Sequence, residues 1–149
     1  MRRAVAVMGV LVFALMVTMG LRAQGQTAAG PQAARQANPD SWQIPPGAPD
    51  EKNPIAVSDK VIAAGKQIYG SKCQRCHGPG GLGDGPDADP DYRPDNLTDS
   101  SRAARNPDGV MFYKIWNGRK KPKMPAFNTE LSKDEVWTVV HFVKTFRKQ

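Results

Sequence analysis

Cysteine and histidine are scarce in this chain, which has two of each among 149 residues. Cys73 and Cys76 are separated by two residues, so a disulfide between them would close too small a loop to stabilise a fold. A structural zinc site would need further soft ligands close by, and beyond residues 73–77 only His141 is available. The scarcity of both residue types therefore argues against a fold stabilised by disulfides or by zinc.

The sequence also lacks the strict alternation of apolar and polar residues that predicts a β-strand. Helical signals are present in three places. Ser58 can cap a helix that runs into the two cysteines, and Asn106 can cap a second helix that Gly118 ends. The third helix begins at a capping box formed by Ser132 and Glu135. We therefore predict an all-α fold.

No large excess of one charge marks the part of the chain that follows the N-terminal segment. The formal net charge of +7 falls to +4 without Arg2, Arg3 and Arg22, which lie in or beside that segment. This balance argues against nucleic-acid binding. The charges are nevertheless uneven in position, because residues 84–99 hold six aspartates and residues 119–123 hold four basic residues. Such an asymmetry can orient a charged partner.

The N-terminal part has the layout of an export signal. Basic residues precede an apolar run at residues 4–21, which is just long enough to span a bilayer. We interpret residues 1–23 as a signal peptide or as an uncleaved anchor, in which residues 4–21 would tether the protein to a membrane. In both cases we expect the remaining chain in the periplasm or at the outer face of the cytoplasmic membrane.

Residues 24–54 are rich in Pro, Ala and Gln and show no periodicity, which predicts a linker. Trp42 and Ile44 interrupt this composition, and we expect them to hold the second half of the linker against the domain surface. Residues 55–149 then form the domain. A domain of roughly 95 residues buries only a modest core, so a bound prosthetic group would help it to fold.

The segment Cys73-Gln74-Arg75-Cys76-His77 has C-x-x-C-H spacing. This spacing allows two thiols to add to the two vinyl groups of a haem while the next residue turns its imidazole toward the iron. A thioredoxin-like redox pair would need a βαβ pattern, which the sequence lacks. The motif therefore predicts one covalently bound haem c, with Cys73 and Cys76 as thioether links and His77 as a ligand of the iron.

Five glycines follow the motif within residues 78–86. A phosphate-binding loop is the rival interpretation, but no predicted strand precedes this segment and it lacks the Lys-Ser/Thr ending. We expect the glycines to let the backbone approach the porphyrin closely. The ring nitrogen of His77 that faces away from the iron should donate to a backbone carbonyl, and Pro79 offers the first candidate.

A second axial ligand must come from farther along the chain, and Met124 is the strongest candidate. Pro122 and Pro125 make its segment stiff and non-helical, so a thioether can be presented at a set distance from the iron. Met111 lies in the second predicted helix and is expected in the core. His141 lies in the third predicted helix, and ligation by two histidines is the weaker alternative.

From about Pro54 to Lys148, the sequence resembles the class I c-type cytochromes, especially bacterial forms in which C-x-x-C-H-G is followed by Gly-x-Gly-Asp-Gly-Pro. The resemblance includes Gly65 and Tyr69, which stand where this family packs its first helix against an aromatic residue of its last helix, here Phe142. It implies a cytochrome c fold, in which three to four helices wrap around one covalently bound haem.

The same resemblance implies that His77 and Met124 are the axial ligands of a low-spin iron and that the protein transfers electrons without being an enzyme itself. We expect a one-electron carrier in a periplasmic or membrane-associated chain, whose redox partners have acidic docking faces. A second interpretation is an electron-transfer subunit docked to a dehydrogenase or oxidase complex. A third is a gas-binding haem sensor, which would require Met124 to be absent from the iron or easily displaced.

Overall fold

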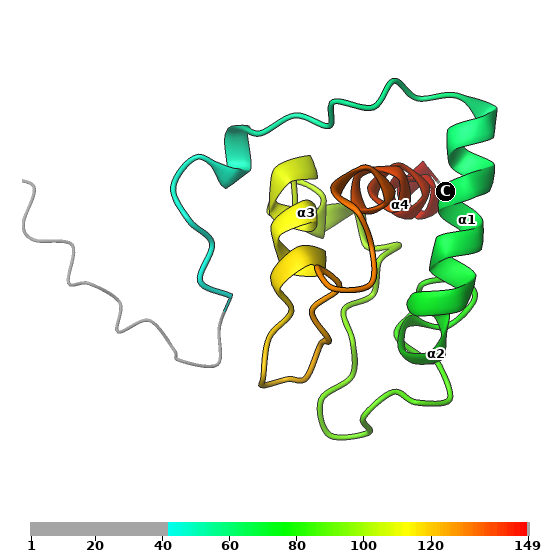
Figure 1. Cartoon of the computed structure of the whole chain (residues 1–149). Coiled ribbons are helices and arrows are strands. Elements are labelled where there is room, and N and C mark those ends of the chain that lie inside the picture. The colour runs from blue at the N-terminus through cyan, green and yellow to red at the C-terminus, as the bar shows by residue number, and fades with distance from the viewer. Residues whose placement is uncertain (1–41, 149) are drawn as a thin grey trace, which may run out of the picture. The chain divides into compact units, whose positions relative to one another are not determined.

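Four α-helices and three short 3-10 helices form the regular structure of the computed structural model, which describes residues 42–148 (Figure 1). The segment predicted at 1–23 and most of the predicted linker lie outside the described residues. No β-strand occurs between residues 42 and 148, and the predicted all-α fold is confirmed. The α-helices are α1 (Asp59–Lys72), α2 (Gln74–His77), α3 (Asp108–Asn117) and α4 (Lys133–Thr145), and the 3-10 helices are η1 (Ala48–Asp50), η2 (Ser100–Arg102) and η3 (Phe146–Lys148).

Side-chain caps begin the two longest helices, as the sequence predicts. The Oγ of Ser58 accepts a hydrogen bond from the backbone N–H of Val61 at 3.3 Å at the start of α1. At α4, the Oγ of Ser132 accepts from the N–H of Glu135 at 3.2 Å, and the Glu135 carboxylate accepts from the N–H of Ser132 at 2.8 Å. These bonds satisfy backbone donors that a helix start otherwise leaves unpaired.

The start of α3 differs from the prediction. Pro107 occupies the N-cap position, and no side chain caps this helix. The expected cap, Asn106, uses its side chain elsewhere: its amide oxygen accepts from Lys114 Nζ at 2.5 Å, and its amide nitrogen donates to the carbonyl of Arg102 at 3.0 Å. The predicted Asn106 cap is therefore wrong, because two tertiary partners compete successfully for the same amide group.

The first and last helices cross at a glycine. A Cβ built on Gly65 would lie 2.7 Å from the carbonyl oxygen of Thr138 and 2.8 Å from the Cβ of Phe142, so no side chain fits there. One turn later, the rings of Tyr69 and Phe142 lie 5.3 Å apart between centroids. The predicted contact of Gly65 and Tyr69 with Phe142 is confirmed, and Figure 1 shows α1 beside α4.

The core lies where α4 meets its neighbours. Val136, Val139 and Val140 of α4 are fully buried, and each such side chain contributes about 1.5–3 kcal/mol of stability. Met111 of α3 is also buried, as predicted. The apolar face of α4 therefore forms the centre of the hydrophobic core. The loops at residues 92–99 and 118–127 instead line a cavity.

Residues 78–107, between α2 and α3, contain one regular element, η2. The start of this loop folds back onto α2, where the N–H of Gly83 donates to the carbonyl of His77 at 2.9 Å. Gly83 has a φ of 77°, and a Cβ there would lie 2.3 Å from the carbonyl oxygen of Pro94. Glycine at this position therefore lets the second half of the loop pack directly on the first half.

The described part of the predicted linker packs on α3 and α4. Ala48 is buried, and a Cβ on Gly109 would lie only 2.1 Å from the carbonyl oxygen of Ala48, so the start of α3 rests on η1. The side-chain amide of Asn53 donates to the carbonyl of Trp137 at 2.8 Å. Across residues 42–148, no helix has the length and apolar character needed to cross a membrane.

Candidate functional site

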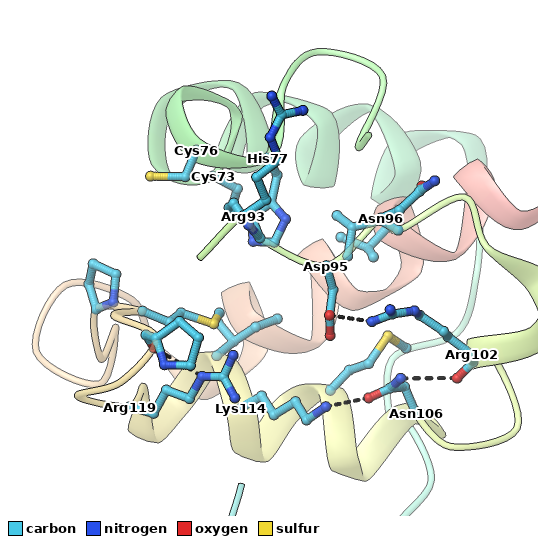
Figure 2. A pocket seen from close by; sticks show the side chains of 18 of the residues that line it. Cys73, Cys76, His77, Arg93, Asp95, Asn96, Arg102, Asn106, Lys114 and Arg119 are labelled. Atoms are coloured by element: carbon cyan, nitrogen blue, oxygen red, sulfur yellow. Dashed lines mark hydrogen bonds and ion pairs between the residues drawn. The ribbon is translucent and has the colours of Figure 1, made fainter. Parts of the chain in front are cut away.

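A cavity opens between α2, the loop at residues 92–99, α3 and the loop at residues 118–127. It comprises about 1240 Å³ of space, part of it open to solvent. Figure 2 shows Cys73 and His77 at one side of this space and Lys114 and Arg119 at the other. The apolar part of the wall includes Tyr69, Leu97, Met111, Ile115, Phe127 and Val143.

A single helical turn carries both cysteines and His77 to the cavity wall. The N–H of Cys73 donates to the carbonyl of Tyr69 at the end of α1, and the N–H of His77 donates to the carbonyl of Cys73, both at 2.9 Å. The two thiols are free. Burial raises the pKa of Cys73 to about 12, and the neighbouring Cys76 adds to the shift. Cys73 is therefore a neutral thiol at neutral pH and can form part of an apolar wall.

The ring of His77 faces the cavity. Its Nδ1 is buried and has no hydrogen-bond partner among the described residues, so the predicted donation to the carbonyl of Pro79 is wrong. Burial lowers the pKa of His77, while the backbone and carboxylate of Asp95 act in the opposite direction. The neutral imidazole, favoured by burial, is the form that ligates a metal ion.

Tyr69 stabilises the turn that follows His77. Its hydroxyl donates to the carbonyl of Gly78 at 2.7 Å, in a buried hydrogen bond that also occupies the carbonyl nearest to the motif. Burial raises the pKa of Tyr69, with smaller contributions from Cys73 and Asp84, so the hydroxyl keeps its proton and remains a donor. The helix crossing and the motif are thus joined through one side chain.

Met124 approaches the cavity from the loop that follows α3. The N–H of Arg119 donates to the carbonyl of Met124 at 2.8 Å, and the N–H of Met124 donates back to Arg119 at 2.9 Å. Arg119 Nε also donates to the carbonyl of Pro122 at 2.9 Å. Gly118 turns the chain into this loop with a φ of 59°. The loop is therefore a closed, hydrogen-bonded turn with Met124 at the cavity wall.

His141 lies elsewhere. Its Nε2 is 2.7 Å from the carbonyl oxygen of Ile55, and the residue does not line the cavity. The described structure thus brings together Cys73, Cys76, His77 and Met124, the four site residues chosen from the sequence. The alternative ligand, His141, lies on α4 and contacts Ile55 outside the cavity.

Seven residues that line the cavity are lysine or arginine and two are aspartate. The basic run at residues 119–123 pointed to Arg119 and Lys123, but sequence analysis missed the other five cations. These five are spread over most of the domain sequence, so no local motif could have identified them, and only the fold brings them together. The cationic residues are Lys72, Arg93, Arg102, Lys114, Arg119, Lys123 and Arg147, and the aspartates are Asp95 and Asp99.

Several of these charges are only partly compensated. Arg102 pairs with Asp95. Burial is the main factor that lowers the pKa of Lys114, whose Nζ donates to the side chain of Asn106. The buried Nε of Arg147 has no hydrogen-bond partner among the described residues. A cavity with this excess of positive charge favours an occupant that carries carboxylates or another anionic group.

The helical fold and this cavity, with two free thiols and an imidazole on one wall, define a c-type cytochrome domain. A family model described as "Cytochrome C oxidase, cbb3-type, subunit III" matches residues 60–143. The match covers more than half of the chain, and the chain belongs to this family. It is accordingly an electron-transfer haem protein with one covalently bound haem c, which confirms the predicted family and cofactor.

Known proteins with similar sequence or structure include an alcohol dehydrogenase, a protein complex and a c-type cytochrome. The chain is 34% identical over 109 residues to the quinohemoprotein alcohol dehydrogenase ADH IIB of Pseudomonas putida, a match that covers 68% of this chain and 14% of that protein. The reducing HAO-like protein complex of Kuenenia stuttgartiensis gives a TM-score of 0.56 at 33% identity, covering 62% of this chain and 46% of that chain. The c-type cytochrome KustC0563 gives a TM-score of 0.50 at 27% identity, covering 56% of this chain and 98% of that chain.

The described residues fit a haem c on three observations of this structure. The cavity has an apolar wall for a flat macrocycle and cations for its two carboxylates. The thiols of Cys73 and Cys76 are free, as thioether formation requires. The imidazole of His77 is half-buried with its Nδ1 buried, and its cavity neighbours include the soft thioether of Met124.

Proposed function

We propose that this protein is a one-electron carrier whose haem iron is ligated by His77 and Met124, and whose haem is linked to Cys73 and Cys76. The observation that carries the proposal is that His77 and Met124 line one cavity although they come from different elements, α2 and the 118–127 loop. Haem c, when bound, supplies an iron that exchanges one electron between its ferric and ferrous states.

The side chains of the cavity determine how readily the electron moves. If the imidazole of His77 and the thioether of Met124 held the iron, no exogenous ligand would need to bind in either oxidation state, so the reorganisation on electron transfer would be small. The thioether of Met124 is a soft ligand that favours the ferrous state, so the reduction potential is higher than two histidines would give. Apolar residues such as Phe127 and Leu97 exclude water and lower the local dielectric.

The basic side chains beside the cavity form the proposed docking surface for an acidic redox partner. Lys120, Lys121 and Lys123 are exposed, and Lys123 also lines the cavity together with Arg119. Their attraction for a negatively charged face would speed encounter and would weaken as salt is added. An electron-transfer rate with the physiological partner that is independent of ionic strength would rule out this surface.

We further propose that the domain at residues 55–149 functions outside the cytoplasm, after residues 1–23 direct export as a signal peptide or anchor and residues 24–54 act as a linker. Covalent haem attachment and a basic start followed by an apolar run both support an exported protein. N-terminal sequencing of the purified protein tests cleavage, and its fractionation with membranes tests tethering through residues 4–21.

A second candidate is an electron-transfer subunit docked to a dehydrogenase or oxidase. It is favoured by the similarity to one part of a quinohemoprotein alcohol dehydrogenase, of which this chain spans 14%. Co-purification of the tagged protein with a larger redox enzyme would favour this candidate over a mobile carrier.

An absorption spectrum of the oxidised protein tests the ligation on which the proposal rests. Sulfur ligation of ferric haem gives a weak band at about 695 nm, which we expect in the wild type and not in Met124→Ala. We also expect Met124→Ala to lower the reduction potential by on the order of 100 mV or more, since the soft ligand is lost.

His141→Ala serves as the control, because His141 lies outside the cavity and should leave the band in place. A wild-type protein without the band, combined with a spectral change in His141→Ala, would contradict the proposed ligation. Rapid binding of carbon monoxide to the ferrous wild type would instead favour a gas-binding sensor.

A further inference from the structure

A tryptophan from outside the matched family segment lines the cavity. Trp42 precedes the matched residues 60–143 by eighteen positions, yet it is part of the cavity wall. Its ring lies beneath two cations, with Arg119 Cζ at 4.7 Å and Lys114 Nζ at 5.3 Å from the ring centroid. Both distances are within the range of a cation–π contact.

Arg119 connects this ring to the Met124 loop. Its Nε donates to the carbonyl of Pro122, and its backbone pairs in both directions with Met124. One arginine side chain is therefore held by Trp42 on one side while it closes the loop on the other. A long side chain such as arginine loses rotational freedom when it adopts this geometry, and a stacked aromatic ring favours the one rotamer that the loop requires.

The segment that carries Trp42 is itself fixed at several points. Ala48 is buried against Gly109 at the start of α3. Asn53 donates to the carbonyl of Trp137, and the carbonyl of Ile55 lies 2.7 Å from His141 Nε2. These contacts anchor the segment to α3 and α4, so Trp42 is presented to Arg119 from a supported chain. Trp42 was expected to hold this segment against the domain, and its two cation contacts agree with that expectation.

We infer that Trp42 is a positioning residue for Met124: through Arg119, residues 42–55 brace the loop that presents the sixth ligand. This inference rests on the proposed function, in which Met124 is that ligand. When Trp42 is removed, Arg119 regains rotational freedom, the Pro122 contact is made less often, and the loop opens more readily. An external ligand then competes with the thioether more effectively.

Imidazole binding to the oxidised holoprotein measures this opening, since imidazole displaces a thioether ligand and removes the band at about 695 nm. We expect Trp42→Ala to bind imidazole on the order of tenfold more tightly than the wild type, the size expected from losing a partly buried cation–π contact. Trp42→Phe keeps an aromatic face and should restore most of the wild-type affinity. Ile44→Ala, on the same segment but outside the cavity wall, is the matched control and should bind as the wild type does.

Arg119→Lys tests whether Trp42 influences imidazole binding through the Arg119 side chain. Lysine keeps the positive charge but cannot reproduce the Nε donation to Pro122, so this variant should also bind imidazole more tightly. The double variant Trp42→Ala/Arg119→Lys should add little to either single change, because both act through one contact. Hydrogen exchange provides a readout independent of ligand binding: the N–H groups of Arg119 and Met124 should exchange faster in Trp42→Ala, and in Ile44→Ala they should not.

Three results would overturn the inference. If the wild type shows the sulfur band but Trp42→Ala matches it in imidazole affinity and in exchange at Met124, the brace does not exist and the proposed ligation stands. An equal effect from Ile44→Ala would mean that general loosening of the segment, and not the contact with Arg119, is responsible. If the wild type itself lacks the band, the proposed ligation fails and the inference fails with it.

Discussion

The crossing of α1 with α4 and the loops around the cavity are built in opposite ways. At the crossing, Gly65 lies against the backbone of Thr138, and the core residues of α4 are fully buried and apolar. Around the cavity, helix ends and irregular loops bring together an excess of cations, two thiols and an imidazole whose Nδ1 has no partner among the described residues. The helix crossing is packed by protein side chains alone. The cavity, in contrast, has an apolar wall and an excess of positive charge that fit a bound cofactor with carboxylates.

The largest expected effect is the loss of covalent haem when the cysteines of the cavity are replaced. Replacing both motif cysteines, in Cys73→Ser/Cys76→Ser, should abolish covalent haem, because a serine hydroxyl cannot form the thioether. Haem staining after denaturing electrophoresis should show none in this variant and full staining in the wild type. Single variants should retain one link and less haem. Covalent haem in the double variant would mean that these residues do not hold the cofactor.

The second largest effect is a loss of stability at the helix crossing, which a comparison of two glycines in α1 can measure. Gly65→Ala places a Cβ against Thr138 and Phe142 and should destabilise the protein by about 1–3 kcal/mol. Gly70 is exposed, and the nearest atom to a Cβ there is 3.9 Å away, so Gly70→Ala should stabilise by about 0.5–1 kcal/mol through helix propensity.

Chemical denaturation of the two holoproteins compares these values directly. Because both positions gain the same helix propensity, the difference between the variants isolates the crossing contact. Equal stability of Gly65→Ala and Gly70→Ala would mean that the helices separate at little cost.

A region of this protein could be predicted from the sequence when the residues that identify it lie close together in the chain. The contact at the crossing was predicted from the resemblance to class I c-type cytochromes, in which Gly65 and Tyr69 stand where the first helix packs against an aromatic residue of the last helix. The motif at residues 73–77 was predictable because its residues are consecutive in the sequence. Most of the cavity cations were not, because residues as distant as Lys72 and Arg147 meet only after folding. The failed cap at Asn106 has this same cause, since its amide bonds Lys114 and Arg102 in preference to its own helix.

A third effect tests whether the two regions are coupled. Tyr69 packs at the crossing through its ring and holds the turn after His77 through its hydroxyl. Tyr69→Phe keeps the ring and removes the hydroxyl donor to Gly78, whose carbonyl still accepts from the N–H of Gly81 at 3.2 Å. The variant should therefore lose about 0.5–1.5 kcal/mol of stability, the net contribution of one hydrogen bond. It should also alter the haem spectrum slightly, because the turn beside His77 loses its support.

The control for Tyr69→Phe is Tyr113→Phe, at a half-buried site on α3 that does not line the cavity, and this change should be nearly silent in both stability and spectrum. A loss of stability in Tyr69→Phe without any spectral change would show that the crossing and the motif are independent.

The smallest effect concerns α4 at a point remote from the cavity. Ser132→Ala removes the acceptor for the N–H of Glu135 and should lower the free energy of unfolding by about 1 kcal/mol without changing the haem spectrum. The backbone and side chain of Ser132 lower the pKa of Glu135, so the charged carboxylate contributes to stability above its usual pKa and this contribution is lost as the pH falls through the lowered value. The difference between wild type and Ser132→Ala should therefore narrow on acidification. A difference that stays constant from neutral pH to the acid limit of folding would mean that the hydrogen bond from Ser132 Oγ to the Glu135 carboxylate contributes nothing, since the backbone N–H of residue 132 donates to that carboxylate in both proteins.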